Sequence, residues 1–585
     1  MVRDASPRAA QPMALVHSRR IPAPSRAALI PRITYLAALL AFVLLLTMPM
    51  DALAAPRDPV LAAISKAKAA KQVTPAESTD LAKTWLASGR AVANSRAGSR
   101  RSNIIAVRGW ATMLARQGSL TADRLDPVMS SVNATMVVML TSPKFPSHEQ
   151  ELRIPGEVAV FTYYSGRGVQ LQPFETFKEG MRQLNQLKPQ VEEAQAIADR
   201  MLGLGVQRGS ALVWEYHFPF NGPSRPWTSA ISQALATEFY YRVAAVLPAE
   251  ERAPYLDAAA GTTRSFLRST GAGGVASPQE TGSFYAMYSF APGQRILNGH
   301  LQSLLNVNRY AKASGSVEAK LVVERGIAGV MPLLAKFDTG AWSNYQPGQE
   351  AELGYHEFQT SQLVKLGDEL PEPTFVEYGA RFEQYLVTPA TLTFGSTAWL
   401  PIIPARDGFR DTITIPYTVD KRARATLVIE SEAGVEVRRF SNTTGRGAGR
   451  LVWDGRTASG AIVPDGAYVA RITTTDIAGN RGYEDVPVPL QVARDVLGPT
   501  LSMYTVREAG MKATLVTVRA SDVGSAWVDA SIRVGSRTVA SRRGGRFGLI
   551  TLRVPLPMAQ VKSGVLALRD SSGNQTLQPL TPAAE

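Results

Sequence analysis

"VEAKLVVERGIAGVMPLL", residues 317–334, decides the fold of the central part of this chain. Apolar side chains recur at Ile327, Val330, Met331 and Leu334, the spacing that places residues on one face of a helix. The same spacing occurs in the stretches 174–187, 191–206, 228–247 and 296–314. Helices of this kind, joined by Gly- and Pro-rich loops, predict an α/α toroid, complete or incomplete, over residues 151–392.

The pattern changes after Pro389. "ATLVIESEAGVEVRRF" (425–440) and "GAYVARITTTDIAGN" (466–480) alternate with period two and have Gly or Asp turns between them. The end of the chain, "LALRDSSGN" (566–574), echoes "ITTTDIAGN" (472–480). The prediction is a multidomain chain in which two all-β, immunoglobulin-like sandwiches, 393–495 and 496–585, follow the toroid-like helical domain.

The first 54 residues have the features of an export signal. Arg19, Arg20, Arg26 and Arg32 precede "YLAALLAFVLLLTMPM" (35–50), and a small-x-small site follows at Ala52-Leu53-Ala54. We therefore expect a signal peptide or an uncleaved N-terminal anchor at 1–54, and a secreted or cell-surface protein. Residues 55–150 are Ala-rich with helical spacing and predict a small helical region to which the sequence assigns no role.

Composition narrows the possible partners and cofactors. The chain has 585 residues, a net charge of +14 and no cysteine, which excludes disulfides, thiolate metal sites and a thiol nucleophile. Residues 393–585 hold 24 Lys and Arg against 17 Asp and Glu, but these basic residues form no dense run. We expect no nucleic-acid binding, no metal and no cofactor. Acidic polymers are the expected partners, and the basic tail could contact a cell-wall or surface glycan.

Two loops in the helical part are unusually aromatic. "DTGAWSNY" (338–345) and "GYHEFQTSQL" (354–363) bring together Trp342, Tyr345, Tyr355 and His356. Aromatic faces stack on apolar sugar faces, and polar tips meet hydroxyls, so the composition suits a carbohydrate site. Each of these residue types is also a common packing group, and packing is the alternative for every one of them.

Three stretches carry a family resemblance: "ILNGHLQSLLNVNRYAKASG" (296–315), "LLAKFDTGAWSNY" (333–345) and "GYHEFQTSQL" (354–363). Together they resemble the C-terminal catalytic domain of the D-glucuronyl C5-epimerases, which invert glucuronate to iduronate in heparosan-type polymers. "PWTSAISQALAT" (226–237) is similar to a helix of the same family. In the tail, "VWDGRTASGAIVPDGAY" (452–468) resembles the Ig-like domain of flagellar hook-capping proteins.

The resemblance implies roles for seven residues, and three more are candidates from their position in the sequence. Epimerisation removes the C5 proton and returns one from the opposite face, so two proton-transfer groups must flank the sugar. The implied catalytic residues are Tyr288, Tyr345 and Tyr355. Trp342, His356, Asn298 and Gln362 would support the site, although Asn298 and Gln362 could equally be helix-end hydrogen-bond partners. Further candidate substrate contacts are Arg225, Glu215 and His217.

The sequence also departs from the family. A glutamate precedes the first tyrosine in the family, whereas this chain has Met287, which cannot transfer a proton; the family's second histidine falls at Gln359. Glu215 or Glu280 could substitute for the missing glutamate. The expected function is glucuronate 5-epimerisation in an exported polysaccharide-modifying isomerase. The alternatives are a uronate lyase, which shares the C5 proton abstraction, and an inactive glycan-binding protein that kept the cleft.

Overall fold

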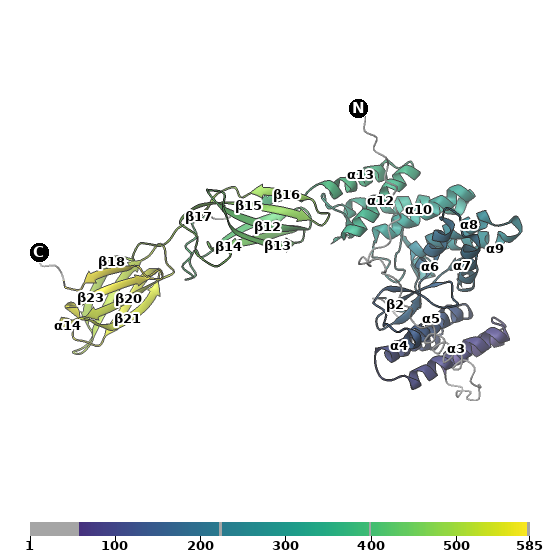
Figure 1. Cartoon of the computed structure of the whole chain (residues 1–585), viewed down its shortest axis with the longest axis horizontal. Helices are drawn as coiled ribbons and strands as arrows, with labels where there is room; N and C mark the ends of the chain where they lie inside the picture. The colour runs from purple at the N-terminus through teal and green to yellow at the C-terminus, as the bar shows by residue number, and fades with distance from the viewer. Residues whose placement is uncertain (1–57, 221–224, 397–398, 582–585) are drawn as a thin grey trace, which may run out of the picture. The chain divides into compact units, whose positions relative to one another are not determined.

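The computed structural model describes residues 58–220, 225–396 and 399–581 (Figure 1). The chain divides into two compact units, and the boundary in the sequence lies between Glu383 and Gln384. The segment predicted as signal peptide or anchor lies outside the described residues. None of the helices in the described ranges combines the length and the apolar character needed to cross a bilayer.

Four helices open the first unit: α2 (Pro59–Ala69), α3 (Pro75–Asn94), α4 (Ser99–Arg116) and α5 (Ala122–Thr141). Their starts follow from local chemistry, since Asp58 caps α2, and Thr74 and Glu77 form a capping box at α3. Trp85, fully buried, is a large member of the core that these helices share.

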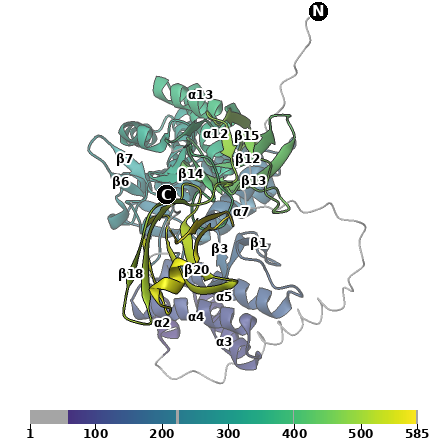
Figure 2. The same cartoon turned by 90° about the vertical axis from the view of Figure 1, so that its left-hand side faces the viewer.

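A small antiparallel sheet follows, in the order β1 (Gln150–Arg153), β2 (Val160–Tyr164) and β3 (Gly168–Leu171). Strand β3 packs against α4 and α5, and Figure 2 shows the sheet beside these helices. Thr135 of α5 fixes the contact, because its hydroxyl accepts the Val169 N–H at 2.8 Å.

Four helical hairpins make up the rest of the first unit. The last helix of the fourth hairpin ends four residues into the second unit, at Val387. Their helices are α6 (Pro173–Leu184) with α7 (Val191–Gly203), α8 (Ala230–Val246) with α9 (Ala253–Thr263), α10 (Leu297–Ser314) with α11 (Val317–Val330), and α12 (Leu353–Glu369) with α13 (Pro373–Val387). The first helices of the hairpins pack in a row, α6 on α8, α8 on α10 and α10 on α12. Because each hairpin reverses the chain, the inner helices run in the same direction. Their N-termini therefore lie on the same side of the row.

Short strands and 3₁₀ turns connect the hairpins. The strands are β4 (Val206–Arg208), β5 (Ala211–Val213), β6 (Ala276–Pro278), β7 (Ser283–Tyr285), β8 (Asn344–Gln346) and β9 (Gln349–Glu350). The 3₁₀ turns are η1 (Ala249–Glu251), η2 (Arg264–Leu267), η3 (Thr270–Ala272) and η4 (Met331–Phe337).

One hydrogen bond recurs in every hairpin and will be called the latch. A backbone N–H in the segment before the inner helix donates to a side chain of that helix, and the pairs are Val160–Thr176 (2.9 Å), Trp214–Gln233 (3.1 Å), Tyr285–His300 (2.9 Å) and Ser343–His356 (3.3 Å). The hairpins are therefore four versions of one strand–helix–helix unit. The latch holds the preceding loop beside the helix start in each of them.

The second unit contains two sandwiches of the same strand order. The first has the sheets β10-β11-β14 and β13-β12-β15-β16, with β17 also on β15; the second has β18-β19-β22 and β21-β20-β23-β24. The strands of the first are β10 (Leu392–Phe394), β11 (Ile413–Val419), β12 (Ala423–Ser431), β13 (Glu436–Thr444), β14 (Gly447–Trp453), β15 (Gly466–Asp476), β16 (Arg481–Asp485) and β17 (Leu490–Val492). The strands of the second are β18 (Thr500–Glu508), β19 (Thr514–Ser521), β20 (Trp527–Val534), β21 (Arg537–Gly545), β22 (Phe547–Val554), β23 (Val565–Asp570) and β24 (Gln575–Pro579), with helix α14 (Met558–Lys562).

The echoed sequences occupy the same turn in the two sandwiches. Asp476 accepts the Asn480 N–H at 2.9 Å, and Asp570 accepts the Asn574 N–H at 2.8 Å. The charge around each aspartate differs. The buried ammonium of Lys421 lies 3.0 Å from Asp476.

The second sandwich has carboxylates where the first has the lysine. Oxygens of Asp570, Asp522 and Asp495 lie within 4.8 Å of one another, and no ion pair joins them to a basic residue in the described part of the chain. Burial and this crowding raise the pKa of both Asp495 and Asp522.

The prediction of a helical part followed by an all-β part is confirmed. The switch of periodicity near Pro389 coincides with the end of α13 at Val387 and the start of β10 at Leu392. The closed ring of a toroid stays a prediction, since the inner helices in the described ranges are seen as a row.

Candidate functional site

The three tyrosines come together at the start of α10 and α12. Tyr288 lies between β7 and α10, Tyr345 lies in β8, and Tyr355 lies in the first turn of α12. The ring centroids of Tyr345 and Tyr355 are 4.7 Å apart. The phenol of Tyr345 is close enough to that of Tyr288 to lower its pKa by hydrogen bonding. All three side chains are half-buried.

The surroundings keep these phenols protonated. Burial raises the pKa of Tyr288, and the nearby ionisable phenol of Tyr355 adds to this, while the hydrogen bond from Tyr345 acts against it. Burial likewise raises the pKa of Tyr345 and of Tyr355. A phenol whose pKa lies above its ordinary value near 10 is a proton donor at neutral pH, not a base. The cluster can therefore give protons but needs a separate group to take one.

An aromatic wall extends from Tyr288. The ring of Tyr288 stacks on Phe220 at 5.7 Å and lies 5.7 Å from Trp227 and 5.5 Å from Phe290. Phe220 in turn lies 6.1 Å from Tyr164 of β2. This surface offers several ring faces beside the phenol hydroxyls, an arrangement suited to sugar rings.

Trp342 and His356 lie behind the tyrosines. Their rings stack at 3.7 Å, and both side chains are fully buried. His356 Nε2 bonds the carbonyl of Phe382 at 3.0 Å, and Ser343 Oγ lies 2.7 Å from its Nδ1. Both rings lie in the packing between α12 and α13, and their role as substrate contacts stays a prediction.

Asn298 and Gln362 join α10 to α12. Gln362 Nε2 donates to the backbone carbonyl of Asn298 at 2.9 Å and to Gln302 Oε1 at 3.1 Å. The helix-linking role of Gln362 is thus present. Asn298 Oδ1 and Gln362 Oε1 are buried acceptors without a hydrogen-bond partner among the described residues. Buried acceptors of this kind are suited to hydroxyl donors of a ligand.

Glu215 and His217 belong to a different cluster. The Glu215 carboxylate is buried, with Arg124 Nε at 2.6 Å, Arg208 Nε at 2.7 Å and His217 Nε2 at 3.4 Å. Burial alone would raise the pKa of Glu215, but the neighbouring His217 and Arg124 side chains lower it overall. The ion pair ties α5 to the β4–β5 hairpin and leaves Glu215 a permanent anion. Arg225 is exposed and lies two residues before Trp227.

Met287 occupies the position of the missing glutamate and is packed there. Its sulfur lies 3.8 Å from Ser229 Oγ, and a Cβ added at Gly299 would come within 2.9 Å of it. Glu280 is exposed. Neither Glu215 nor Glu280 is brought to this space.

Sequence reasoning missed Glu149, in the turn before β1. Its charge raises the pKa of Tyr355 and adds to that of Tyr288 and Tyr164. Glu149 therefore acts electrostatically on the tyrosine cluster. The one sequence signal is an adjacent His–Glu pair at a strand start in "PSHEQEL" (146–152), which is too common to single out.

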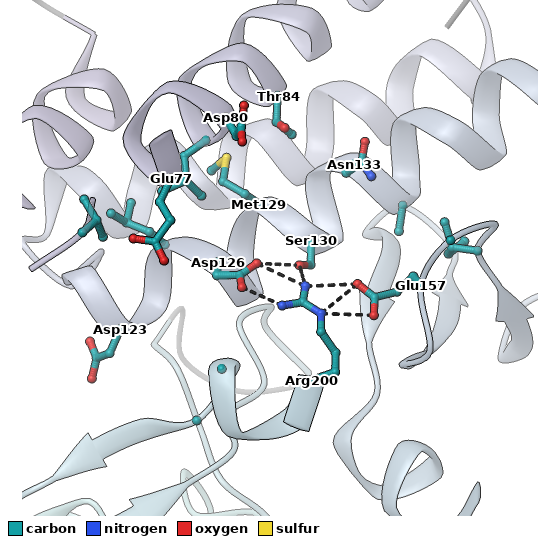
Figure 3. A pocket seen from close by; sticks show the side chains of 18 of the residues that line it. Glu77, Asp80, Thr84, Asp123, Asp126, Met129, Ser130, Asn133, Glu157 and Arg200 are labelled. Carbon is teal, nitrogen blue, oxygen red and sulfur yellow. Dashed lines mark hydrogen bonds and ion pairs between the residues drawn. The ribbon is translucent and has the colours of Figure 1, made fainter. Parts of the chain in front are cut away.

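A separate cavity of about 710 Å³ lies between α3, α5 and α7 (Figure 3). Its lining includes the acidic residues Glu77, Asp80, Asp123, Asp126 and Glu157. The single basic side chain, Arg200, is held by Asp126 at 2.6 Å and Glu157 at 3.0 Å, so its charge is neutralised within the wall. Carboxylates dominate what remains, and this cavity does not fit an anionic uronate.

Comparisons with known proteins agree with this placement. Residues 208–384 match the family model of the D-glucuronyl C5-epimerase C-terminus, and residues 406–477 match the FlgD Ig-like domain. Both resemblances expected from the sequence are thereby confirmed. Tyr288, Tyr345 and Tyr355 all lie within the first match.

An uncharacterized protein of Methanocaldococcus jannaschii is 23% identical over 180 residues, which are 30% of this chain and 58% of that protein. The chain thus spans less than two thirds of that relative. Among solved structures, FlgD from P. aeruginosa is 17% identical, covering 23% of this chain and 86% of that one with a TM-score of 0.14. FlgD from Xanthomonas campestris is 18% identical, covering 30% and 91% with a TM-score of 0.14.

Proposed function

We propose that this chain, whose residues 208–384 form a D-glucuronyl C5-epimerase C-terminal domain, inverts C5 of glucuronate in a heparosan-like polysaccharide. The observation that carries the proposal is the meeting of Tyr288, Tyr345 and Tyr355 in one half-buried cluster beside an aromatic wall. A proton α to a carboxylate is acidic enough for such chemistry when its anion is stabilised.

The phenols suit the second half of the reaction. Their raised pKa values keep them protonated, so each can deliver a proton to the C5 carbanion or donate a hydrogen bond to the charge that develops on the uronate carboxylate. We also propose that the protein acts after export and that the basic sandwiches hold it near a cell-wall or surface glycan.

The test is incubation with heparosan or glucuronan in deuterated water. Deuterium at C5 together with iduronate, seen by NMR, is the expected result. Absorbance at 232 nm without iduronate would instead show lyase chemistry. Tyr355→Phe should lower C5 exchange about 10²–10⁴-fold while polymer binding persists, since only a hydroxyl is removed. Tyr483→Phe, in the exposed part of β16, is the matched control and should exchange at the parent rate.

A second candidate, a glycan-binding protein without activity, is favoured by Met287. Its thioether cannot transfer a proton, and it fills the space where the family has a carboxylate. Polymer binding without C5 exchange on either substrate would support this reading over the first.

A further inference from the structure

We infer that Glu149 is the proton-transfer group on the sugar face opposite the tyrosines, in place of the carboxylate that Met287 has replaced; this inference rests on the proposed epimerase function. Three features of the turn that carries Glu149, before β1, support this inference. They are an unusual backbone conformation, contact with the aromatic wall and an accessible carboxylate.

The backbone at Glu149 is held in an unfavourable conformation. Its φ is +61°, in the left-handed region that residues with a side chain seldom adopt. The Glu149 N–H donates to the Tyr163 carbonyl at 2.8 Å, and the Ser165 N–H donates to His148 Nδ1 at 3.1 Å. These bonds fix the turn against β2. Conformations of this kind are concentrated at functional sites, where surrounding structure maintains them.

A continuous set of ring contacts connects this turn to Tyr288 through two intermediate aromatic rings. The His148 ring lies 5.9 Å from Tyr164, Tyr164 lies 6.1 Å from Phe220, and Phe220 stacks on Tyr288 at 5.7 Å. The electrostatics agree, because the Glu149 charge acts on both Tyr288 and Tyr355.

Accessibility separates Glu149 from Glu215. Its side chain is 47% exposed and its nearest basic group, His148 Nε2, is 3.9 Å away. Glu215, by contrast, is fully buried between two arginines. A base must reach its proton, and only Glu149 of these two carboxylates is open to a substrate that lies on the aromatic wall.

The step balances without a co-reactant. The C5–H bond breaks, its proton passes to the Glu149 carboxylate, and the electron pair spreads into the uronate carboxylate. A phenol O–H of the tyrosine cluster then breaks, and its proton forms the new C5–H bond on the opposite face. Solvent water takes the proton from Glu149 and returns one to the phenolate, so the enzyme regains its starting state.

The experiment compares the full-length parent chain with two variants. These are Glu149→Gln and the matched control Glu151→Gln, which lies in the adjoining strand β1. C5 exchange on heparosan is followed in deuterated water over a range of pH. Heparosan binding and the thermal midpoint are measured in parallel. Glu149→Gln should lower exchange about 10²–10⁴-fold, with binding and thermal midpoint unchanged. Glu151→Gln should match the parent.

The outcomes separate the two claims. If the parent exchanges C5 hydrogen and Glu149→Gln does so at the same rate and with the same pH profile, the assignment of Glu149 is wrong while the proposed function stands. If the parent exchanges nothing on heparosan or glucuronan, the proposed function and this inference fail together. If Glu149→Gln loses both C5 exchange and thermal stability, Glu149→Asp decides between the two causes. This variant keeps the carboxylate and should restore part of the exchange. No restoration would overturn the inference.

Discussion

His300 and His356 make the same pair of hydrogen bonds in successive hairpins. In each, Nδ1 accepts a backbone N–H from the segment before the helix, and Nε2 bonds a carbonyl 26 residues further along, that of Gly326 or Phe382. Each imidazole also stacks on an aromatic ring, Phe284 at 4.3 Å and Trp342 at 3.7 Å. Both histidines therefore serve as neutral structural links between hairpin helices.

Lowering the pH should decrease the free energy of unfolding of the first unit, because His300 takes up a proton more readily in the unfolded chain. Burial lowers the pKa of His300 to about 3, from an ordinary value of 6.5. The neutral ring therefore contributes stability that is complete above pH 6.5 and is lost as pH falls toward 3. At pH 5 the loss should be about 2 kcal/mol. His300→Gln should reduce this pH dependence, measured by urea unfolding at pH 5 and 7, because Gln233 forms the equivalent latch without a titrating group. An unchanged dependence would show that other groups control it.

Glu215→Gln should damage stability more than chemistry. The substitution leaves Arg124 and Arg208 without the carboxylate that pairs with both, and breaking such a buried pair costs about 3–5 kcal/mol. Urea unfolding should show this loss, while C5 exchange below the unfolding transition stays near the parent rate. Loss of exchange at unchanged stability would identify Glu215 as the base.

Met287→Glu should increase C5 exchange above the parent rate. The side chains are similar in length, so a glutamate would extend into the space beside Gly299 and Ser229 that the thioether fills. The new carboxylate would add a second acid–base group next to Tyr288. Met287→Gln, of the same shape but unable to take a proton, is the control. Equal rates for the two variants would mean that this position does no proton transfer in this chain.

Asp522→Asn should stabilise the second sandwich. Burial and the neighbouring Asp570 raise the pKa of Asp522. Its carboxyl group therefore ionises less readily in the folded protein than in the unfolded chain. A raised acid pKa means that ionisation destabilises the fold as pH rises past the ordinary value near 4. The amide removes that charge and can still accept the Gly524 N–H. Calorimetry at pH 7 should show the transition of this sandwich a few degrees higher. Asp529→Asn, whose partner Arg543 is exposed, should not raise it.

Much of the fold and part of the site could be predicted from local pattern. The change from helical to alternating spacing near Pro389 identified both parts, because burial of one face imposes a period on each element. Tyr288, Tyr345 and Tyr355 were found because they lie in motifs that a family resemblance covers. Glu149 was not, since its role depends on a turn that is distant in sequence from the tyrosines.

The position of Glu215 in its ion pair has a cause in the local sequence. In the extended segment 214–217, Trp214 and Tyr216 point to one side and pack on aromatic partners, Phe177 and Trp227. Alternation then sends Glu215 to the other side, toward Arg124. Period-two reasoning could have separated Glu215 from the aromatic face, although the identity of its distant partner in α5 could not be read from the sequence.

The latch bonds also bear on how the chain reaches its native state. Each joins residues only 13 to 19 positions apart, from Ser343–His356 to Trp214–Gln233. A hairpin can therefore close its own latch before the next hairpin is available, and the row of inner helices can grow by addition of finished neighbours. Low contact order of this kind favours rapid, stepwise folding. A chain that is synthesised N-terminus first can fold in the order in which its hairpins appear, with each hairpin serving as the template for the next.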